Sequence, residues 1–504
     1  MNVQKLGTTL YLLENFYVDT ANIDKVTEDA IIAALKELDP HSAYISKKDV
    51  EKMNEPLVGS FEGIGVTFQL IRDTITVISP TAGGPSEKVG IMAGDQFIRI
   101  DGEESVGKKV DNEYVQKHLR GKKGTKVTVS VKRGNNPELI DFEITRDKIP
   151  LNSINAAYML DNQVGYIKLD RFAQESVKEF KEALGKLQKQ DMESLIFDLR
   201  GNTGGYLNTA IDLVDQFLTE DQLIVFTEGI HSPRQEWRSN RSGLYTAGKL
   251  VVLIDEGSAS ASEILSGAIQ DHDRGVVIGR RSFGKGLVQR PFNLPDGAVI
   301  RLTTSRYHTP SGRCIQRPYE GGVEEYAKEM TKRLEHGEYF HADSNHFPDS
   351  LKYKTDSCRT VYGGGGIMPD IFIPVDTAYN SKLYTNLIRK GALNRFTTDY
   401  ALKRREDIKA QYGNFEQFNK DFNIDGSLIE GLKKAAEDAK VEWNDEQFAH
   451  SEKFLLLQMK ALIARNVWET QHYYQVMSST DPGIQKALEV LGNDKQYKSI
   501  LKKK

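Results

Sequence analysis

The sequence predicts an α/β core that carries an inserted α+β module and has helical regions at both ends of the chain. Short apolar strands alternate with helical stretches over residues 150–310. Residues 60–147 contain β-rich runs separated by glycine turns, and both ends of the chain show helical spacing of apolar residues. A chain of 504 residues is too long for a single core. At about 150 residues per domain, we expect three or four domains.

The N-terminal region, residues 1–59, is predicted to be helical. Its apolar residues recur with helix spacing at Leu6, Leu10, Leu13, Phe16, Ile31, Ile32, Leu35 and Leu38. Asp39-Pro40 ends the second helix, because a residue that precedes proline is disfavoured in the helical region.

Residues 60–147 form the predicted α+β module. Strands are expected over Gly65–Leu70, Thr74–Ser79, Gln96–Ile100, Lys126–Lys132 and Glu138–Thr145, and short helices over Ser86–Val89 and Asn112–Leu119. This pattern is typical of a small barrel-like module.

The predicted core spans residues 148–376. Its strands are Val164–Leu169, Ser194–Asp198, Leu250–Asp255, Val276–Gly279 and Ile371–Pro374, and its helices are Ser176–Gln190, Leu207–Phe217 and Ser260–Gln270. Residues 315–360 are polar, and we expect an irregular insertion or surface loop there. The spacing of its His336, His341 and His346 fits neither one helix face nor a zinc motif, which favours a solvated loop.

Residues 377–504 are predicted to form a C-terminal helical domain. The apolar stretch between Phe454 and Trp468 favours either a packed core or an oligomer interface. A homo-oligomer is therefore one possible assembly.

Composition excludes some classes of protein. The 67 basic residues are balanced by 71 acidic ones, so the net charge gives no sign of a nucleic-acid partner. No signal-peptide pattern opens the chain, so the protein is cytosolic or its targeting segment is absent from this chain. Cys314 and Cys358 are two free thiols or, in an oxidising compartment, a disulfide. No metal or cofactor is implied.

The main chemical signal combines Ser260, Lys285 and Gln289. A serine hydroxyl is a weak nucleophile that needs an adjacent base. A lysine serves as that base only if burial or nearby positive charge depresses its pKa. Gln289 would then hold the amine, as in serine-lysine variants of the catalytic triad. Taken alone, Lys285 is typical of an exposed lysine in a glycine turn.

Ser260 also begins a capping box with Glu263, and the tetrapeptide alone favours that structural role. The two roles are compatible, because a helix start offers unpaired N–H groups to an oxyanion. The Gly201–Gly205 turn is a flexible loop or a second oxyanion donor, since the spacing of phosphate-binding motifs is missing. A Ser-His esterase using His272 or His308 is a competitor, although His272 is typical of a solvated helix end.

Together these stretches resemble the carboxyl-terminal processing protease family. The matching stretches, in the family's order, are Leu38–Ser42, Asp198–Gly205, Gly257–Ile264, Gln270-Asp271 with Arg274, Ser282–Gln289, Thr303–Gly312 and Gly366–Asp370. The resemblance covers roughly residues 5–376. It implies a ClpP/crotonase-like core and endopeptidase activity near the C-termini of protein substrates.

The resemblance also implies roles for single residues. Ser260 would be the nucleophile, Lys285 the general base and Gln289 the group that orients it. The oxyanion donors would be the Ala261 amide and the amide of Gly204 or Gly205. Asp271 would support activity without contacting Lys285, because a carboxylate in contact with Lys285 would favour the charged form of the lysine.

The α+β module resembles a PDZ domain. Phe61, Gly63, Ile64, Gly65 and Val66 match the loop that captures a C-terminal carboxylate. Arg120 is either a solvated cation or a residue that couples peptide binding to protease alignment. The implied partners are substrates with free C-termini and an adaptor or activator, and the implied location is the periplasm or cell envelope. The alternative is a PDZ-based binding scaffold whose protease core is inactive or latent.

Overall fold

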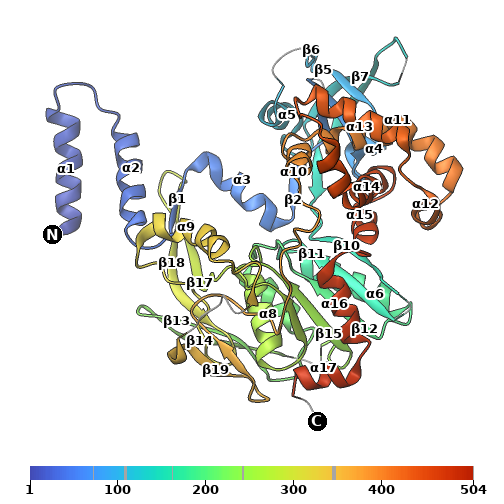
Figure 1. The fold of residues 1–504 in the computed structure, drawn as a ribbon. Helices are drawn as coiled ribbons and strands as arrows, with labels where there is room; N and C mark the ends of the chain where they lie inside the picture. Colours follow the sequence, from blue (N-terminus) through green and yellow to red (C-terminus); the bar gives the residue numbers. More distant parts are fainter. Residues whose placement is uncertain are drawn as a thin grey trace.

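The computed structural model describes residues 1–71, 73–106, 110–134, 136–161, 163–240, 243–342 and 348–502. Figure 1 shows a sheet-based core and a helical hairpin of α1 and α2 that stands away from it. The inserted module and most C-terminal helices lie together on the other side of the core from this hairpin. His346, for which a solvated loop was predicted, lies outside the described residues.

The core is a six-stranded sheet in the order β10-β11-β12-β15-β16-β21. The strands are β10 (Ile154–Met159), β11 (Val164–Leu169), β12 (Ser194–Asp198), β15 (Lys249–Ile254), β16 (Val276–Gly279) and β21 (Ile371–Phe372). All neighbours from β11 to β21 pair in parallel, and β10 is antiparallel to β11. The five predicted core strands are confirmed, with shifts at their ends. Their continuous apolar sequences reflect burial on both faces.

Helices cover both faces of this sheet. One face packs with α6 (Ser176–Gln188), α7 (Leu207–Val214) and α8 (Ala261–Asp271). The other face packs with α16 (Pro482–Leu491) and α17 (Asp494–Ile500) from the end of the chain. The C-terminal region therefore completes the core on one side.

A second sheet lies beside the core and was not predicted. It contains β1 (Ala43–Ile45), β13 (Leu223–Gly229), β14 (Ser232–Arg238), β17 (Leu287–Asn293) and β18 (Val299–His308). Strand β1 pairs with β18 and so brings the N-terminal region onto the sheet. That region is otherwise helical, with α1 (Asn2–Phe16), α2 (Ile23–Lys36) and α3 (Lys47–Val58).

The inserted module has the predicted strands and helices. Its sheet has the order β3 (Val66–Ile71), β4 (Thr74–Pro80), β5 (Gln96–Ile100), β7 (Lys126–Lys132) and β8 (Ile140–Thr145), with β6 (Glu103–Glu104) paired to β5. Its helices are α4 (Pro85–Lys88) and α5 (Asn112–Leu119). A two-stranded ribbon of β2 (Ser60–Gly63) and β9 (Asp147–Pro150) contains both connections to the core.

The prediction of an irregular surface loop over 315–360 is wrong. This segment contains α9 (Gly322–Glu335) and a hairpin of β19 (Lys352–Lys354) and β20 (Thr360–Tyr362), with a short 3₁₀ turn (Asp349–Leu351) before it. Arg317, Tyr326 and Arg333 are buried. Ion pairs of Arg317 with Glu329 and of Arg333 with Glu338 make that burial possible. The polar sequence therefore suggested a surface loop where the segment is in fact packed.

The remaining C-terminal helices share a core of their own. They are α10 (Lys382–Arg389), α11 (Ala392–Tyr412), α12 (Phe415–Asp421), α13 (Gly426–Asp438), α14 (Asp445–Val467) and α15 (Thr470–Met477). Leu455, Met459 and Ile463 are fully buried there, so packing accounts for the apolar stretch of α14.

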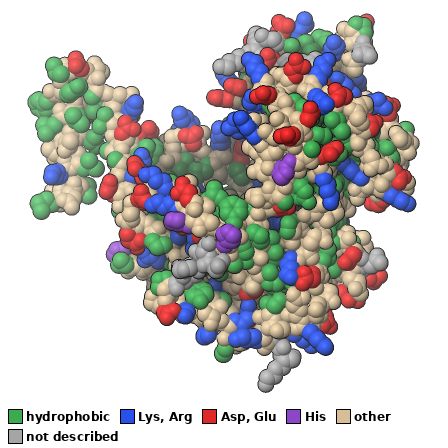
Figure 2. Space-filling view, viewed as in Figure 1, with side chains coloured by type: hydrophobic (Ala, Val, Ile, Leu, Met, Phe, Trp, Pro, Cys, Tyr) green, Lys and Arg blue, Asp and Glu red, His purple; other side chains and the backbone are tan. Residues whose placement is uncertain are grey.

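The surface of the N-terminal hairpin is more apolar than is usual. No residue of α1 is buried, and Figure 2 shows hydrophobic side chains gathered over it. Among the described residues, no helix is both long and apolar enough to cross a membrane. Cys314 and Cys358 are free thiols in this structure.

Candidate active site

Ser260 occupies a strained turn between β15 and α8. It is the N-cap of α8, and its backbone has φ 56° and ψ −111°, outside the regions that serine ordinarily adopts. The Glu263 carboxylate accepts a hydrogen bond from the Ser260 N–H at 2.8 Å, as the capping box predicts. Strain of this kind persists only where the surroundings enforce it, and it is concentrated at functional sites.

The Gly204–Gly205 turn lies against this serine. Gly204 has φ +102°, and a Cβ there would lie 2.9 Å from Ser260 Cβ and 3.0 Å from Ala261 N, so only glycine fits. The Gly204 N–H donates to Asn202 Oδ1 at 2.9 Å. In the described part of the chain, the N–H groups of Gly205 and Ala261 have no hydrogen-bond partner. Of the two glycines, Gly205 therefore has the free donor.

Glu263 joins the serine turn to the lysine loop. Its carboxylate accepts hydrogen bonds from Ser282 Oγ at 2.5 Å, Gly284 N at 2.6 Å and Lys285 N at 2.9 Å, in addition to the Ser260 N–H. Complete burial raises the pKa of Glu263. The sequence pointed only to the capping role, because the other donors come from a loop about twenty residues later.

Lys285 is half-buried and lies near another cation. Burial and then the positive charge of Arg301 lower the pKa of Lys285, although the carboxylates of Glu263 and Asp39 oppose the shift. Its Nζ lies 3.5 Å from Gln289 Oε1, at the limit of a hydrogen bond. Within the described residues, Lys285 Nζ makes no hydrogen bond to Ser260 Oγ.

Tyr307 also connects the two loops. Its buried hydroxyl lies 2.5 Å from the Lys285 carbonyl and 3.1 Å from the Ser260 carbonyl, so it can donate to both. The sequence placed Tyr307 in a matching stretch without giving it a role. Neither Tyr307 nor Arg301 could be assigned from spacing, because both reach the site from β18.

The N-terminal region contributes to the lysine side of the site. Thr303 is the register partner of Gln289, and its N–H donates to Ser42 Oγ at 3.0 Å while its hydroxyl donates to Asp39 at 3.1 Å. His41 Nε2 lies 2.9 Å from the Tyr326 hydroxyl. Burial and then the charge of Lys285 lower the pKa of His41 to about 4, so this histidine is neutral at pH 7.

The loop of the inserted module that was predicted to bind a carboxylate has two free N–H donors. Ile64 O accepts hydrogen bonds from Ser86 N at 3.0 Å and from Ser86 Oγ at 2.7 Å, and Gly65 has φ +72°. Among the described residues, the N–H groups of Ile64 and Gly65 have no partner. Phe61 and Gly63 instead belong to β2 and pair with β9.

Comparison with known proteins decides the family. The sequence profile of peptidase family S41 matches residues 163–325, and that of the PDZ domain matches residues 63–144. The carboxy-terminal processing protease CtpB of Bacillus subtilis is 33% identical over 69% of this chain and 71% of its own length. The chain belongs to the carboxy-terminal processing proteases of peptidase family S41.

The chain is also similar to other proteins. A carboxy-terminal-processing protease of Bartonella bacilliformis is 34% identical over 62% of this chain and 72% of its own. A solved structure of a photosystem II D1 C-terminal processing protease is 28% identical and covers 63% of this chain and 84% of its own, with a TM-score of 0.38. Residues 383–469 match a family of unknown function.

Two further sequence candidates, Asp271 and His272, lie at the far end of α8 in this S41 peptidase. Ser260 precedes this 11-residue helix, so Asp271 lies about 16 Å away at about 1.5 Å per residue. Asp271 pairs with the buried Arg313 at 2.7 Å and accepts from Ser311 N at 3.0 Å. His272 follows at the C-cap, and its ring nitrogens lie 2.8 Å from Asp356 Oδ2 and 2.7 Å from Leu223 O.

The two histidines considered as alternative bases, His272 and His308, are both packed against other residues. His272 lies at a helix end as predicted, but its side chain is only 8% exposed, so it is not solvated. Its contacts with Asp356 and Leu223 bury the ring against β13. His308 stacks on Phe226 with ring centroids 4.7 Å apart. Both rings have structural contacts of their own.

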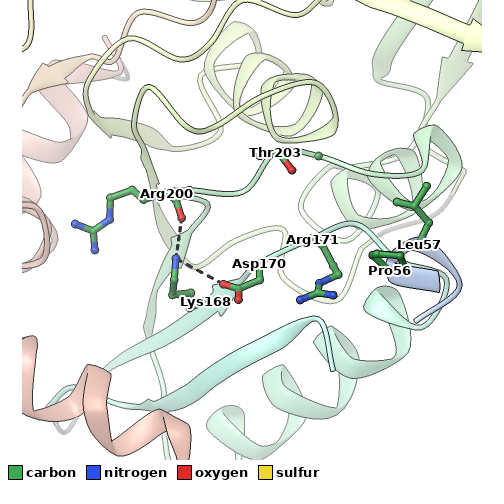
Figure 3. Close-up of a pocket in the computed structure, with 9 residues that line it drawn as sticks. Pro56, Leu57, Lys168, Asp170, Arg171, Arg200 and Thr203 are labelled. Atoms are coloured by element: carbon green, nitrogen blue, oxygen red, sulfur yellow. Dashed lines mark hydrogen bonds and ion pairs between the residues drawn. The ribbon is translucent and has the colours of Figure 1, made fainter. Parts of the chain in front are cut away.

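A cavity of about 450 Å³ adjoins the serine turn of this peptidase (Figure 3). It lies between the end of α3 and the loop that follows β12. Its lining consists of Pro56, Leu57, Lys168, Asp170, Arg171, Arg200, Gly201, Thr203 and Gly204. Because Gly204 also contacts Ser260, the cavity opens beside the nucleophile turn.

Proposed function

We propose that this chain is a serine endopeptidase that cleaves protein substrates near their C-termini, with Ser260 as nucleophile and Lys285 as general base. The observation that carries the proposal is the strained turn of Ser260 at the head of α8, beside the free N–H groups of Ala261 and Gly205. The lowered pKa of Lys285 on the adjoining loop supports it, since only a neutral amine can accept the serine proton.

The proposed reaction begins when Ser260 Oγ attacks the scissile carbonyl. Lys285 accepts the hydroxyl proton and passes it to the leaving amine, and it then activates the water that hydrolyses the acyl-enzyme. The Ala261 and Gly205 N–H groups hold the oxyanion. Gln289 orients the amine, because its Oε1 is the atom near Lys285 Nζ.

We propose that substrate binding brings Lys285 to Ser260. The two side chains share no hydrogen bond in this structure, in which both residues are described, and the contact of Lys285 with Gln289 is long. The PDZ domain would capture the substrate carboxylate on the Ile64 and Gly65 N–H groups, and the peptide would add to β3 beside Val66. An adaptor or activator that favours the aligned state fits the same scheme.

The finer architecture supports related proposals. The parallel strands β11, β12, β15 and β16, with α8 starting at the nucleophile, support a ClpP/crotonase-like core. Asp271 would support activity indirectly, by fixing Arg313 and the 309–313 turn at the far end of α8. A periplasmic or envelope location remains a prediction that cell fractionation would test.

The decisive experiment compares the wild type with Ser260→Ala on an unfolded protein. Mass spectrometry would locate the cleaved bonds, and circular dichroism would confirm that the variant is folded. We expect cleavages clustered toward the C-terminus of the substrate for the wild type, and none for Ser260→Ala. Turnover by a folded Ser260→Ala would refute the assignment of the nucleophile, and binding without cleavage by the wild type would favour the scaffold alternative.

A further inference from the structure

The cavity beside Gly204 has a cationic wall. Figure 3 shows Lys168, Asp170 and Arg171 side by side at the end of β11, with the Arg171 side chain between Asp170 and Leu57. The side chain of Arg200 points away from this group. Pro56 and Leu57 supply an apolar wall from α3.

Two of the three cations in the lining have partners. Arg200 pairs with Asp198 at 2.6 Å and with Asp481 at 2.9 Å. Lys168 Nζ donates to the Arg200 carbonyl at 2.8 Å and lies 3.9 Å from the carboxylates of Asp170 and Asp198.

Arg171 is the remaining cation. Within the described chain its guanidinium has neither a hydrogen bond nor an ion pair, and Asp170 is its acidic neighbour in the lining. Asp170 is itself engaged, because it accepts a hydrogen bond from the Asn155 amide and lies near Lys168. Arg171 therefore has only a longer-range attraction to Asp170. An arginine fork in a cavity that is neither hydrogen-bonded nor ion-paired is suited to a carboxylate, which it can bind with two parallel hydrogen bonds.

The cavity is within reach of a peptide bound at the nucleophile. Gly204 lines it, and a Cβ on Gly204 would lie 2.9 Å from Ser260 Cβ. An extended peptide advances about 3.3 Å per residue, so residues about one to three positions from the scissile bond would enter the cavity.

We propose that Arg171 determines specificity by binding a carboxylate of the substrate within about three residues of the scissile bond. This inference rests on the proposed function, and it adds a subsite separate from the PDZ carboxylate loop. The carboxylate has two sources: the side chain of an aspartate or glutamate, or the free terminus of a peptide that ends in the cavity.

The test uses peptides built around a bond that the wild type cleaves in an unfolded protein. One set places Glu, Gln or Lys at each of the three positions on either side of that bond, with an unchanged distal C-terminus. A second set ends three residues after the bond, as a free acid or as an amide. We expect the wild type to prefer a carboxylate over its amide by on the order of tenfold in kcat/KM.

Variants then assign this preference to Arg171. Arg171→Gln should remove it, and Arg171→Glu should reverse it toward the lysine peptides. Lys186→Glu is the matched control, because it makes the same change of charge at an exposed position of α6 outside the cavity lining. Circular dichroism would show that each variant is folded.

Each outcome is decisive. A preference confined to the Glu peptides identifies a side chain as the ligand, and one confined to the free acid identifies a terminus. Equal cleavage of acids and amides by the wild type, or an unchanged preference in Arg171→Glu, would overturn the inference. Loss of that cleavage in Ser260→Ala would at the same time leave the proposed function standing. A wild type that cleaves no protein or peptide would overturn both.

Discussion

Two regions of the molecule present pairs of backbone N–H groups without partners among the described residues. One pair, Gly205 and Ala261, lies in the protease core, and the other, Ile64 and Gly65, lies in the PDZ domain. Each pair includes the N–H group of a glycine with positive φ, Gly205 or Gly65. Only the core pair adjoins a serine in a strained turn and the loop of a half-buried lysine with a lowered pKa. Under the proposed function, the side chains around each pair decide whether its N–H groups serve chemistry or recognition.

The two turns also differ in how tightly they are packed. A Cβ at Gly204 would lie 2.8 Å from Ala259 O and 3.0 Å from Ala261 N, which are backbone atoms of the nucleophile turn. A Cβ at Gly65 would lie 2.9 Å from the terminal Cδ1 of Ile149, which can move. The turn at Gly204 is therefore held by backbone atoms, whereas the turn at Gly65 has some freedom to adapt.

Replacing each glycine by alanine should give the largest contrast. Gly204→Ala should lower kcat by about 100-fold or more, because it displaces an oxyanion donor. Gly65→Ala should raise KM severalfold and leave kcat nearly unchanged. Steady-state kinetics and thermal melts on both variants would measure this.

The control for that contrast is Gly124→Ala. Gly124 has φ +87° and open space around it, so this variant isolates the backbone cost, which is on the order of 1 kcal/mol. If Gly65→Ala lowered kcat as much as Gly204→Ala, the claim that only the Gly204 turn acts in the chemical step would be contradicted.

A smaller effect is expected from the connection between the two regions. Arg120 pairs with Glu55 on α3, and its guanidinium carbon lies 4.5 Å from the ring centroid of Phe61. Since α3 also lines the cavity beside Gly204, Arg120→Ala should lower kcat/KM on protein substrates by about three- to tenfold. Kinetics over a wide range of substrate concentration would detect it.

The neighbouring Lys123→Ala is the matched control for Arg120. Lys123 is 62% exposed and pairs only with Asp147 among the described ion pairs, so its loss should have no effect on cleavage. If Arg120→Ala and Lys123→Ala cleaved at the same rate as the wild type at every concentration, Arg120 would have no coupling role.

The sequence predicted local structure well, and the structure connects the loops of the candidates Ser260 and Lys285 through Glu263. Glycine turns bounded strands such as Ser194–Asp198, and the apolar period located helices such as Asn112–Leu119, so these boundaries match the structure. The sheet of β13, β14, β17 and β18 was missed, because its strands include many polar residues and only long-range pairing of β13 with β18 joins its two hairpins.

The residues that tune the site were also missed, for a related reason. Arg301, Tyr307 and Asp39 come from segments far from Ser260 in sequence, and only the fold brings them to Lys285. Glu263 was recognised as a cap, yet three of its four hydrogen bonds come from the Ser282–Lys285 loop. Spacing reveals such contacts only when they are local.

The central claim is that Lys285 acts as the base in its neutral form, and the pH dependence of kcat/KM tests it most directly. Burial and Arg301 lower the pKa of Lys285, so activity should rise with pH as the amine loses its proton, with a midpoint below the ordinary lysine value of 10.5. His41, with a pKa of about 4, does not titrate in that range.

Arg301→Met supplies the control for this measurement. Without the neighbouring cation the charged amine is favoured, so the midpoint should move to higher pH, and activity at neutral pH should fall about tenfold for each unit of that shift. A wild-type profile that is flat from pH 6 to 10, or an Arg301→Met midpoint that stays in place or moves to lower pH, would contradict a lysine base.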